Sequence, residues 1–155
     1  MRSGGFTLVE FVLVMVLLII MTAVAVPRFT AVQSLRVNAA ARGIASDIRY
    51  AQSLAISAGK NHRVVFSAGG YTIEENAGGW QYITFPVTAD NFIVQIAADY
   101  EGVVIDSSYT VEFNSLGEPV VGGGGSFTVS NGGANPCRQI SIVNNIGRVQ
   151  IGACP

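Results

Sequence analysis

The stretch GFTLVEFVLVMVLLIIMTAVAVP, residues 5–27, determines how the whole chain is organised. Its only ionisable residue is Glu10, and every other residue from Phe6 to Val26 is apolar or a threonine. At about 1.5 Å per residue these residues form about 32 Å of helix, and the hydrocarbon core of a bilayer is about 30 Å thick. The sequence therefore predicts a transmembrane helix over residues 6–26.

Glu10 is out of place in that helix. A carboxylate near the middle of a bilayer costs about 2.5 to 3.5 kcal/mol. We therefore expect another group to pair with the Glu10 carboxylate. Because Glu10 stands only four residues after Phe6, a simpler interpretation is a membrane anchor whose carboxylate reaches the interface. That interpretation leaves the Gly-Gly pair directly before Phe6 unexplained.

The flanks of the apolar run differ from those of an ordinary secretory signal. Residues 1–5 hold one cation, Arg2, which favours an N-terminus on the cytoplasmic side. Secretory signals place small residues after the apolar core, whereas here a Gly-Gly pair precedes it. Ala23 and Ala25 form an A-x-A-like pattern, so cleavage after the span is the second possibility.

The run Gly5-Phe6-Thr7-Leu8-Val9-Glu10, followed by apolar residues and Pro27, resembles the class III signal of type IV pilins and type II secretion pseudopilins. The resemblance implies that a prepilin peptidase cleaves after Gly5 and methylates the new amine of Phe6. It also implies that Glu10 pairs with the Phe6 ammonium of a neighbouring subunit in a helical filament. Each charge would otherwise lie unpaired in an apolar core.

Residues 27–59 predict a second, amphipathic helix. Its apolar residues recur at the three-and-four spacing of a helix with one buried face. Pro27 removes one backbone hydrogen bond and can kink the join with the first helix, and Gly59 can adopt the left-handed conformation that ends a helix. The apolar stripe comprises Val37, Ala40, Ala41, Ile44, Ile48, Ala51 and Ala55, and Arg42, Asp47, Arg49 and Gln52 lie opposite it.

Residues 60–155 predict a β-rich globular head. Short β-branched or aromatic runs follow one another there, each bounded by Gly, Asn, Asp or Pro. Alternation at Tyr71 and Ile73, and at Val111 and Phe113, indicates strands with one buried face. A helix followed by short strands is typical of an α+β fold, with the amphipathic helix covering an antiparallel sheet. The expected strands are 63–66, 71–74, 82–85, 92–96, 109–113, 127–129 and 139–143.

The head is net acidic, which argues against a broad electrostatic surface for nucleic acid. Its basic residues are Lys60, Arg63, Arg138 and Arg148, and its acidic residues are Glu74, Glu75, Asp90, Asp99, Glu101, Asp106, Glu112 and Glu118.

Cys137 and Cys154 are the only cysteines. Behind a transmembrane segment they would lie outside the cytoplasm, where disulfides persist. Closing a loop of about 18 residues would stabilise the head by about 3 kcal/mol on the chain-entropy model. Two free thiols or a metal pair are the alternatives, but no second cysteine pair or histidine cluster accompanies them. We expect a structural disulfide that closes a C-terminal loop.

Three further segments, 46–55, 113–117 and 146–149, resemble the GspH/FimT group of minor pseudopilins and minor pilins. Mannose-sensitive haemagglutinin (MSHA)-type pilins carry similar segments. The resemblance implies a pilin-like fold, in which one long N-terminal helix packs on an antiparallel β-sheet head.

The FimT-like branch is associated with DNA uptake through a C-terminal Gly-Arg-x-Arg motif. Here residues 147–150 read Gly-Arg-Val-Gln. Gln150 can hydrogen-bond a phosphate, but it releases no counterion and lacks the guanidinium fork. A small DNA-binding spot of Arg148 and Arg138 is the alternative prediction, against two solvated arginines beside the disulfide loop.

The other candidates for chemistry predict no enzyme, no cofactor and no metal site. We expect His62, the only histidine, to be a solvated turn residue rather than a general base. Glycines 122–125 lack the Gly-Lys-Ser/Thr ending of a phosphate loop and predict a flexible connection. Trp80 and Tyr82 could form an adhesive patch, but an aromatic residue on a strand more often packs in the core.

The whole sequence predicts a single-pass protein of a bacterial inner membrane. Residues 1–5 are the leader, 6–26 the span, 27–59 the amphipathic helix and 60–155 a periplasmic head. The resemblance implies a structural minor subunit of a type II secretion pseudopilus or type IV pilus, in the periplasm or at the cell surface. Its implied partners are other pilin or pseudopilin subunits, the prepilin peptidase, an inner-membrane assembly platform and membrane lipid. The alternatives are a DNA-binding minor pilin and an anchored head that binds a partner without a filament.

Overall fold

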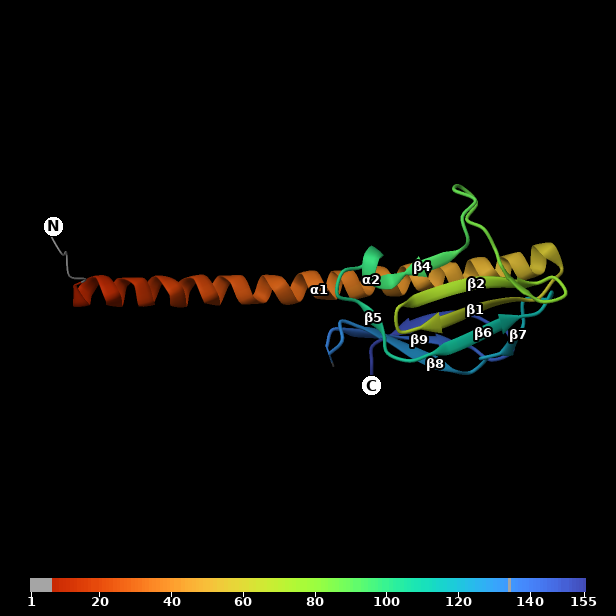
Figure 1. Ribbon diagram of the computed structural model, residues 1–155. Helices are drawn as coiled ribbons and strands as arrows, with labels where there is room; N and C mark the ends of the chain where they lie inside the picture. The colour runs from red at the N-terminus through yellow and green to blue at the C-terminus, as the bar shows by residue number, and fades with distance from the viewer. Residues whose placement is uncertain (1–6, 134) are drawn as a thin grey trace.

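One long helix joined to a β-rich head makes up the molecule (Figure 1). The computed structural model describes residues 7–133 and 135–155, and for residues 23–30 it describes the backbone alone. Gly5 and Phe6, the predicted cleavage site, lie outside the described residues. Among the described residues, no helix has an apolar stretch long enough for a membrane crossing. Since the predicted span 6–26 lies partly outside them, it stays a prediction.

Helix α1 (Leu8–Ala58) starts and ends with ordinary capping. The Thr7 hydroxyl accepts a hydrogen bond from the Glu10 backbone N–H at 3.3 Å, which satisfies one of the free donors of the first turn. Gly59 closes the helix in the left-handed conformation, with φ of 66°. The backbone stays helical through Pro27, so the two helices expected on either side of it are one element.

The second half of α1 buries the predicted stripe. All seven of its apolar residues are buried, and Ala45 is buried with them. On the predicted outer face, Arg42 and Arg49 are exposed, whereas Asp47 and Gln52 are half-buried because they bond to the head.

The head contains two antiparallel sheets, where one was expected. Their strands take the orders β3-β2-β1-β6-β7, with β4 also paired to β2, and β10-β9-β8-β5. The elements are β1 His62–Ser67, β2 Gly70–Asn76, β3 Trp80–Tyr82, β4 Ile93–Gln95, α2 Ile96–Asp99, β5 Val104–Ile105, β6 Tyr109–Phe113, β7 Pro119–Val121, β8 Ser126–Ser130, β9 Cys137–Ile142 and β10 Val149–Gly152.

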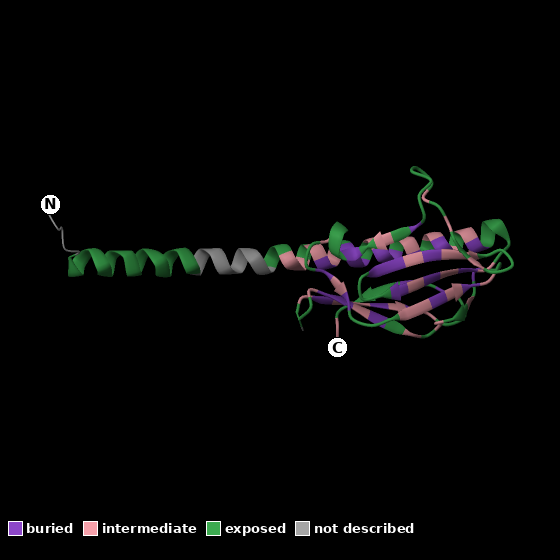
Figure 2. Cartoon of the chain, in the orientation of Figure 1, coloured by how far each residue is buried: buried purple, intermediate pink, exposed green. Residues whose placement is uncertain are grey.

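The core lies between α1 and both sheets, as the buried residues in Figure 2 show. Phe66 from the first sheet and Phe127 from the second pack with ring centroids 4.5 Å apart, and Ile48 of α1 is fully buried in the same cluster. This single core fixes the position of the head along the helix. The predicted α+β, pilin-like fold is therefore confirmed.

Several local predictions are wrong. His62 is 2% exposed and begins β1, with Nδ1 3.1 Å from the Lys60 carbonyl oxygen. Trp80 lies outside the core, and the Arg63 guanidinium stacks over its ring at 4.0 Å. Residues 122–125 form a hydrogen-bonded turn rather than a loose connection. The Gly124 N–H donates to the Ile142 carbonyl oxygen, and the Ile142 N–H donates to the Gly125 carbonyl oxygen.

Candidate assembly interface

Residues 8–21, which we call the apolar half of α1, present apolar side chains all round the helix. From Leu8 to Met21 the large apolar residues are between 43% and 80% exposed in the single chain. This part of the helix projects beyond the head (Figure 2). A helix that is apolar all round is stable in a protein core or in lipid. The apolar half of α1 therefore has to be surrounded by lipid or by another protein molecule.

Glu10 lies in the first turn of this apolar half. The free N–H groups at the start of a helix favour a negative charge there. Within the described part of the chain, Glu10 makes no ion pair. Its predicted partner, the Phe6 amine, lies outside the described residues, so the pairing stays a prediction.

One flank of the head portion of α1 is bonded to the last two strands. Arg138 Nε donates to Asn38 Oδ1 at 2.7 Å, and an Arg49 guanidinium nitrogen donates to the Val149 carbonyl oxygen at 3.2 Å. Further along, the Gln52 amide donates to the carbonyl oxygens of Gly117 and Ile146 at 2.7 and 3.0 Å. We call this line of contacts the α1–β10 seam.

The opposite flank of α1 meets α2 and β2. Arg36 forms a 2.9 Å ion pair with Glu101, just after α2. The Tyr71 hydroxyl of β2 donates to the Asp47 carboxylate at 2.5 Å. Burial raises the pKa of Asp47 above its ordinary value, and the Tyr71 hydrogen bond offsets part of that rise. Burial and the adjacent Asp47 carboxylate both raise the pKa of Tyr71.

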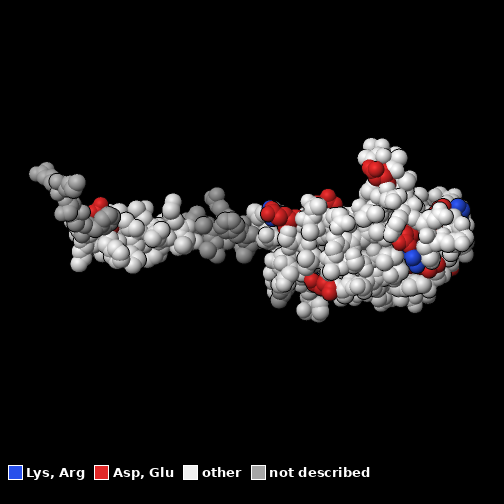
Figure 3. Space-filling model, in the orientation of Figure 1, with Lys and Arg blue, Asp and Glu red and all other residues white. Residues whose placement is uncertain are grey.

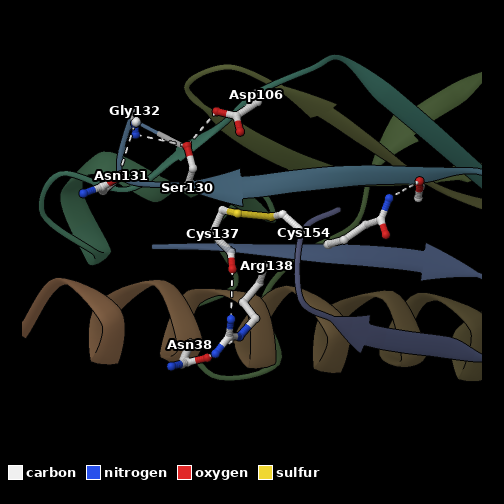
Figure 4. The surroundings of a disulfide bond; sticks show 11 residues. Asn38, Asp106, Ser130, Asn131, Gly132, Cys137, Arg138 and Cys154 are labelled. Carbon is white, nitrogen blue, oxygen red and sulfur yellow. Dashed lines mark hydrogen bonds between the residues drawn. A yellow bond between two sulfur atoms is a disulfide. The ribbon is translucent and has the colours of Figure 1, made fainter. Parts of the chain in front are cut away.

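The expected disulfide joins Cys137 and Cys154, whose Cα atoms are 6.0 Å apart (Figure 4). It ties the tail after β10 to the start of β9. Nearby, the Ser130 hydroxyl donates to the Asp106 carboxylate at 2.8 Å and accepts from the Gly132 N–H at 3.0 Å, which holds the turn after β8. The C-terminus is therefore fixed to the second sheet.

The two arginines predicted as a DNA-binding spot lie at opposite ends of the β9–β10 hairpin. Arg148 pairs across the hairpin with Val143, since the Val143 N–H donates to its carbonyl oxygen. Arg138 is five residues from Val143, or about 16 Å along a strand. Figure 4 shows Arg138 pointing at Asn38 of α1, and it also donates to the Cys137 carbonyl oxygen. Arg148 is exposed.

The contacts of Arg49 and Gln52 with the last hairpin were not predicted. Sequence spacing placed both residues on the face opposite the apolar stripe, and spacing alone gives no sign that a sheet edge reaches that flank. The backbone carbonyls that accept their hydrogen bonds leave no pattern in a sequence.

A long helix with an exposed apolar part, joined to a β-rich head, is typical of a pilin-like subunit. Comparison with known proteins identifies the family. A family model described as "Type II transport protein GspH" matches residues 40–145. The chain therefore belongs to the GspH family of minor pseudopilins and minor pilins.

Solved structures with the same fold agree with that assignment. The minor pseudopilin EpsH of the Vibrio cholerae type 2 secretion system has a TM-score of 0.56 and 18% identity over 76% of this chain and 97% of its own. The type IV minor pilin FimU of Pseudomonas aeruginosa has a TM-score of 0.53 and 20% identity over 74% and 91%. At this identity the likeness concerns the fold. Curated protein sequences gave no match.

Proposed function

We propose that this chain is a minor structural subunit that enters a type II secretion pseudopilus or a type IV pilus. The observation that supports this most directly is the apolar half of α1, exposed from Leu8 to Met21 and interrupted only by Glu10 among charged residues. Before assembly, lipid of the inner membrane covers this half, with the head in the periplasm. After assembly, the same half of neighbouring subunits covers it. Membership of the GspH family supports the same role.

In this proposal a prepilin peptidase removes residues 1–5 and methylates the Phe6 amine, and an inner-membrane platform adds the subunit to the filament. Glu10 then pairs with the Phe6 ammonium of a neighbour. Pairing matters because each charge alone in an apolar bundle costs several kcal/mol. The position of Glu10 in the first turn of α1 supports this role, because the free N–H groups there favour a negative charge.

The test of the pairing is Glu10→Ala in the full chain. We expect the variant to be processed and retained in the membrane but lost from sheared filaments. Asp90→Ala, which removes an exposed head carboxylate, is the matched control and should enter filaments normally. Normal incorporation of Glu10→Ala would refute the assembly role. Intact-mass analysis of the wild type should show loss of residues 1–5 and one added methyl group, whereas an unprocessed chain would leave only the membrane-anchor hypothesis.

The second candidate is DNA binding by a minor pilin. The exposed Arg148 next to Gly147 favours it, while the separation of Arg148 from the bonded Arg138 leaves a single free cation at that end of the hairpin. In this hypothesis the full chain in detergent retards duplex DNA at low salt, and Arg148→Ala abolishes the shift. No retardation at micromolar protein would exclude it.

A further inference from the structure

The first sheet has one face in the core and one face turned away from it. Val64 of β1 and Ile73 of β2 are fully buried in the core. Successive side chains of a strand point to opposite faces, so the residues that alternate with these two lie on the outer face. The side chains of the outer face are half-buried or exposed (Figure 2). A ligand can therefore reach this face from solvent.

Trp80, Tyr82 and Ile93 form an apolar row along one edge of the outer face. Strands β3 and β4 both pair with β2, and the three residues stand opposite every second residue of β2, namely Asn76, Glu74 and Thr72. Neighbours in the row are therefore about 7 Å apart and share one face. Tyr82 is 50% exposed and Ile93 is 41% exposed. The row offers flat apolar surface to a ligand.

A group of charged side chains lies beside the apolar row. Arg63 Nε donates to Glu74 Oε2 at 2.7 Å, and the guanidinium lies over the Trp80 ring at 4.0 Å. On the next strand, the Glu112 carboxylate accepts a hydrogen bond from the Asn61 amide at 2.7 Å. Figure 3 shows red atoms next to blue ones on the front of the head, with uncharged surface around them. Because these side chains hold one another in place, they can hydrogen-bond a polar ligand with little loss of side-chain entropy.

A hollow of about 210 Å³ continues the row beyond Ile93. Ile93 lines it as an apolar wall, and the exposed polar side chains of Ser67 and Gln95 line it as well. At Gly70 the strand β4 approaches β2 so closely that a Cβ would overlap a β4 carbonyl oxygen. Pockets for drug-sized ligands measure about 300 to 1,000 Å³. This hollow therefore fits one small group of a larger ligand, a group that is partly apolar and partly polar.

We infer that the outer face of the first sheet binds a glycan strand of N-acetylated amino sugars. The apolar C–H face of a sugar ring stacks on Tyr82 beside Trp80, and its hydroxyl groups bond to the charged group around Arg63. An N-acetyl group enters the hollow, because its methyl group packs on Ile93 and its amide bonds to polar side chains there. The inference rests on the proposed function for the place of the head in the periplasm, where the glycan of this chemistry is cell-wall peptidoglycan.

A glycan suits this face better than an extended peptide or a nucleic acid does. Strands β3 and β4 have three residues each, and the segment between them projects from the head (Figure 1). Neither strand offers a long row of backbone groups to which a further strand could pair. Two carboxylates accompany the single cation Arg63, so the face does not attract the phosphates of a nucleic acid.

The fluorescence of Trp80 tests the inference, because Trp80 is the only tryptophan of the chain. The full chain, in a detergent without a sugar headgroup, is titrated with a chitin oligosaccharide, whose sugars are N-acetylglucosamine. We expect a saturable shift of the emission, and Tyr82→Ala should raise Kd about tenfold because the stacking is lost. Leu116→Ala removes an exposed apolar side chain from the turn after β6 and is the matched control, with unchanged Kd.

Three outcomes would overturn the glycan site. They are no saturable shift with the wild type, equal Kd for the wild type and a Tyr82→Ala variant with unchanged circular dichroism, and a shift caused by an arginine-rich peptide but not by the sugar. The hollow is tested separately with a cellulose oligosaccharide, which has the same backbone without N-acetyl groups. We expect it to bind more weakly than the chitin oligosaccharide, and Ile93→Ala should reduce that difference. Equal binding of the two sugars by the wild type would refute the role of the hollow.

Co-sedimentation with purified peptidoglycan sacculi tests the source of the glycan. The wild type should sediment with the sacculi and Tyr82→Ala should remain in the supernatant. Binding of the chitin oligosaccharide without binding of sacculi would refute the assignment to the cell wall. None of these assays requires a filament. Glycan binding by a chain that is absent from sheared filaments would refute the proposed function alone, and incorporation without glycan binding would refute the glycan site alone.

Discussion

Glu10 and Asp47 are carboxylates on one helix in opposite surroundings. Asp47 is half-buried against β2 and accepts a hydrogen bond from Tyr71 within the same chain, whereas Glu10 stands in an exposed apolar segment. The unusual position of Glu10 is visible in the sequence, because one charge interrupts a long apolar run. The role of Asp47 is not, since a charge on the polar face of an amphipathic helix is ordinary.

Asp47 makes the stability of the head depend on pH. Because its pKa is raised above 3.8 in the folded chain, the folded state binds the proton more readily than the unfolded state. Stability from this group is therefore complete below pH 3.8 and is lost as the pH rises through the folded pKa. We expect the wild type to lose stability relative to Asp47→Asn over that interval, measured by urea unfolding at a series of pH values.

The Tyr71→Phe variant is the control for this pH effect. It removes the hydrogen bond that holds down the pKa of Asp47, so the loss of stability with rising pH should become larger in that background. A difference between the wild type and Asp47→Asn that stays constant from acid to neutral pH would contradict the prediction.

At the scale of elements, sequence patterns predict long and regular features best. The buried stripe of α1 and strands β1, β2, β6, β8 and β9 follow from periodicity and β-branched runs. The patterns miss β5, β7, β10 and α2, which have two to four residues each, too few for a period to show. The expected strand 82–85 fails because β3 ends at Tyr82 and only a Thr84–Asn91 bridge follows. Division into two sheets depends on long-range pairing, which local sequence does not encode.

The turn between β9 and β10 depends on Gly147, which has φ of 64°. A Cβ there would lie 2.7 Å from Gln52 Nε2 and 2.7 Å from Phe113 Cε1. We expect Gly147→Ala to lower the free energy of unfolding by about 2 to 4 kcal/mol, from left-handed backbone strain of about 1 to 2 kcal/mol plus overpacking. Chemical denaturation measures this cost.

Gly78→Ala separates the two causes. Gly78 has φ of 89° but no atom within 4 Å of its Cβ position, so this variant should show the backbone strain alone. Equal losses in Gly147→Ala and Gly78→Ala would mean that the close approach of α1 to this turn has no energetic effect.

At the scale of the whole molecule, the head and the second half of α1 bury their apolar side chains against each other, whereas residues 8–21 of α1 leave theirs exposed. The buried cluster begins at Val37 and includes both sheets, while residues 8–21 contribute nothing to it. The apolar run predicts this separation from the sequence. The position of the α1–β10 seam could not be predicted, because it depends on how the second sheet packs against one flank of the helix.

A fragment of residues 31–155 should therefore fold without the first half of α1. We expect it to be monomeric in detergent-free buffer and to unfold cooperatively, because it retains the whole buried cluster and the disulfide. Circular dichroism melting and size-exclusion chromatography check this. The full chain should require detergent in the same buffer, and aggregation of the fragment would contradict the prediction.

The unbroken course of α1 has a mechanical consequence. At 1.5 Å per residue its 51 residues extend about 76 Å, and the same helix that projects from the head also forms one wall of the core. A pull along the axis therefore loads all rows of the buried stripe at once, in shear, whereas a pull across the sheets would separate strands one after another. The tension that a filament bears along its length would reach the head in the direction in which its packing resists most.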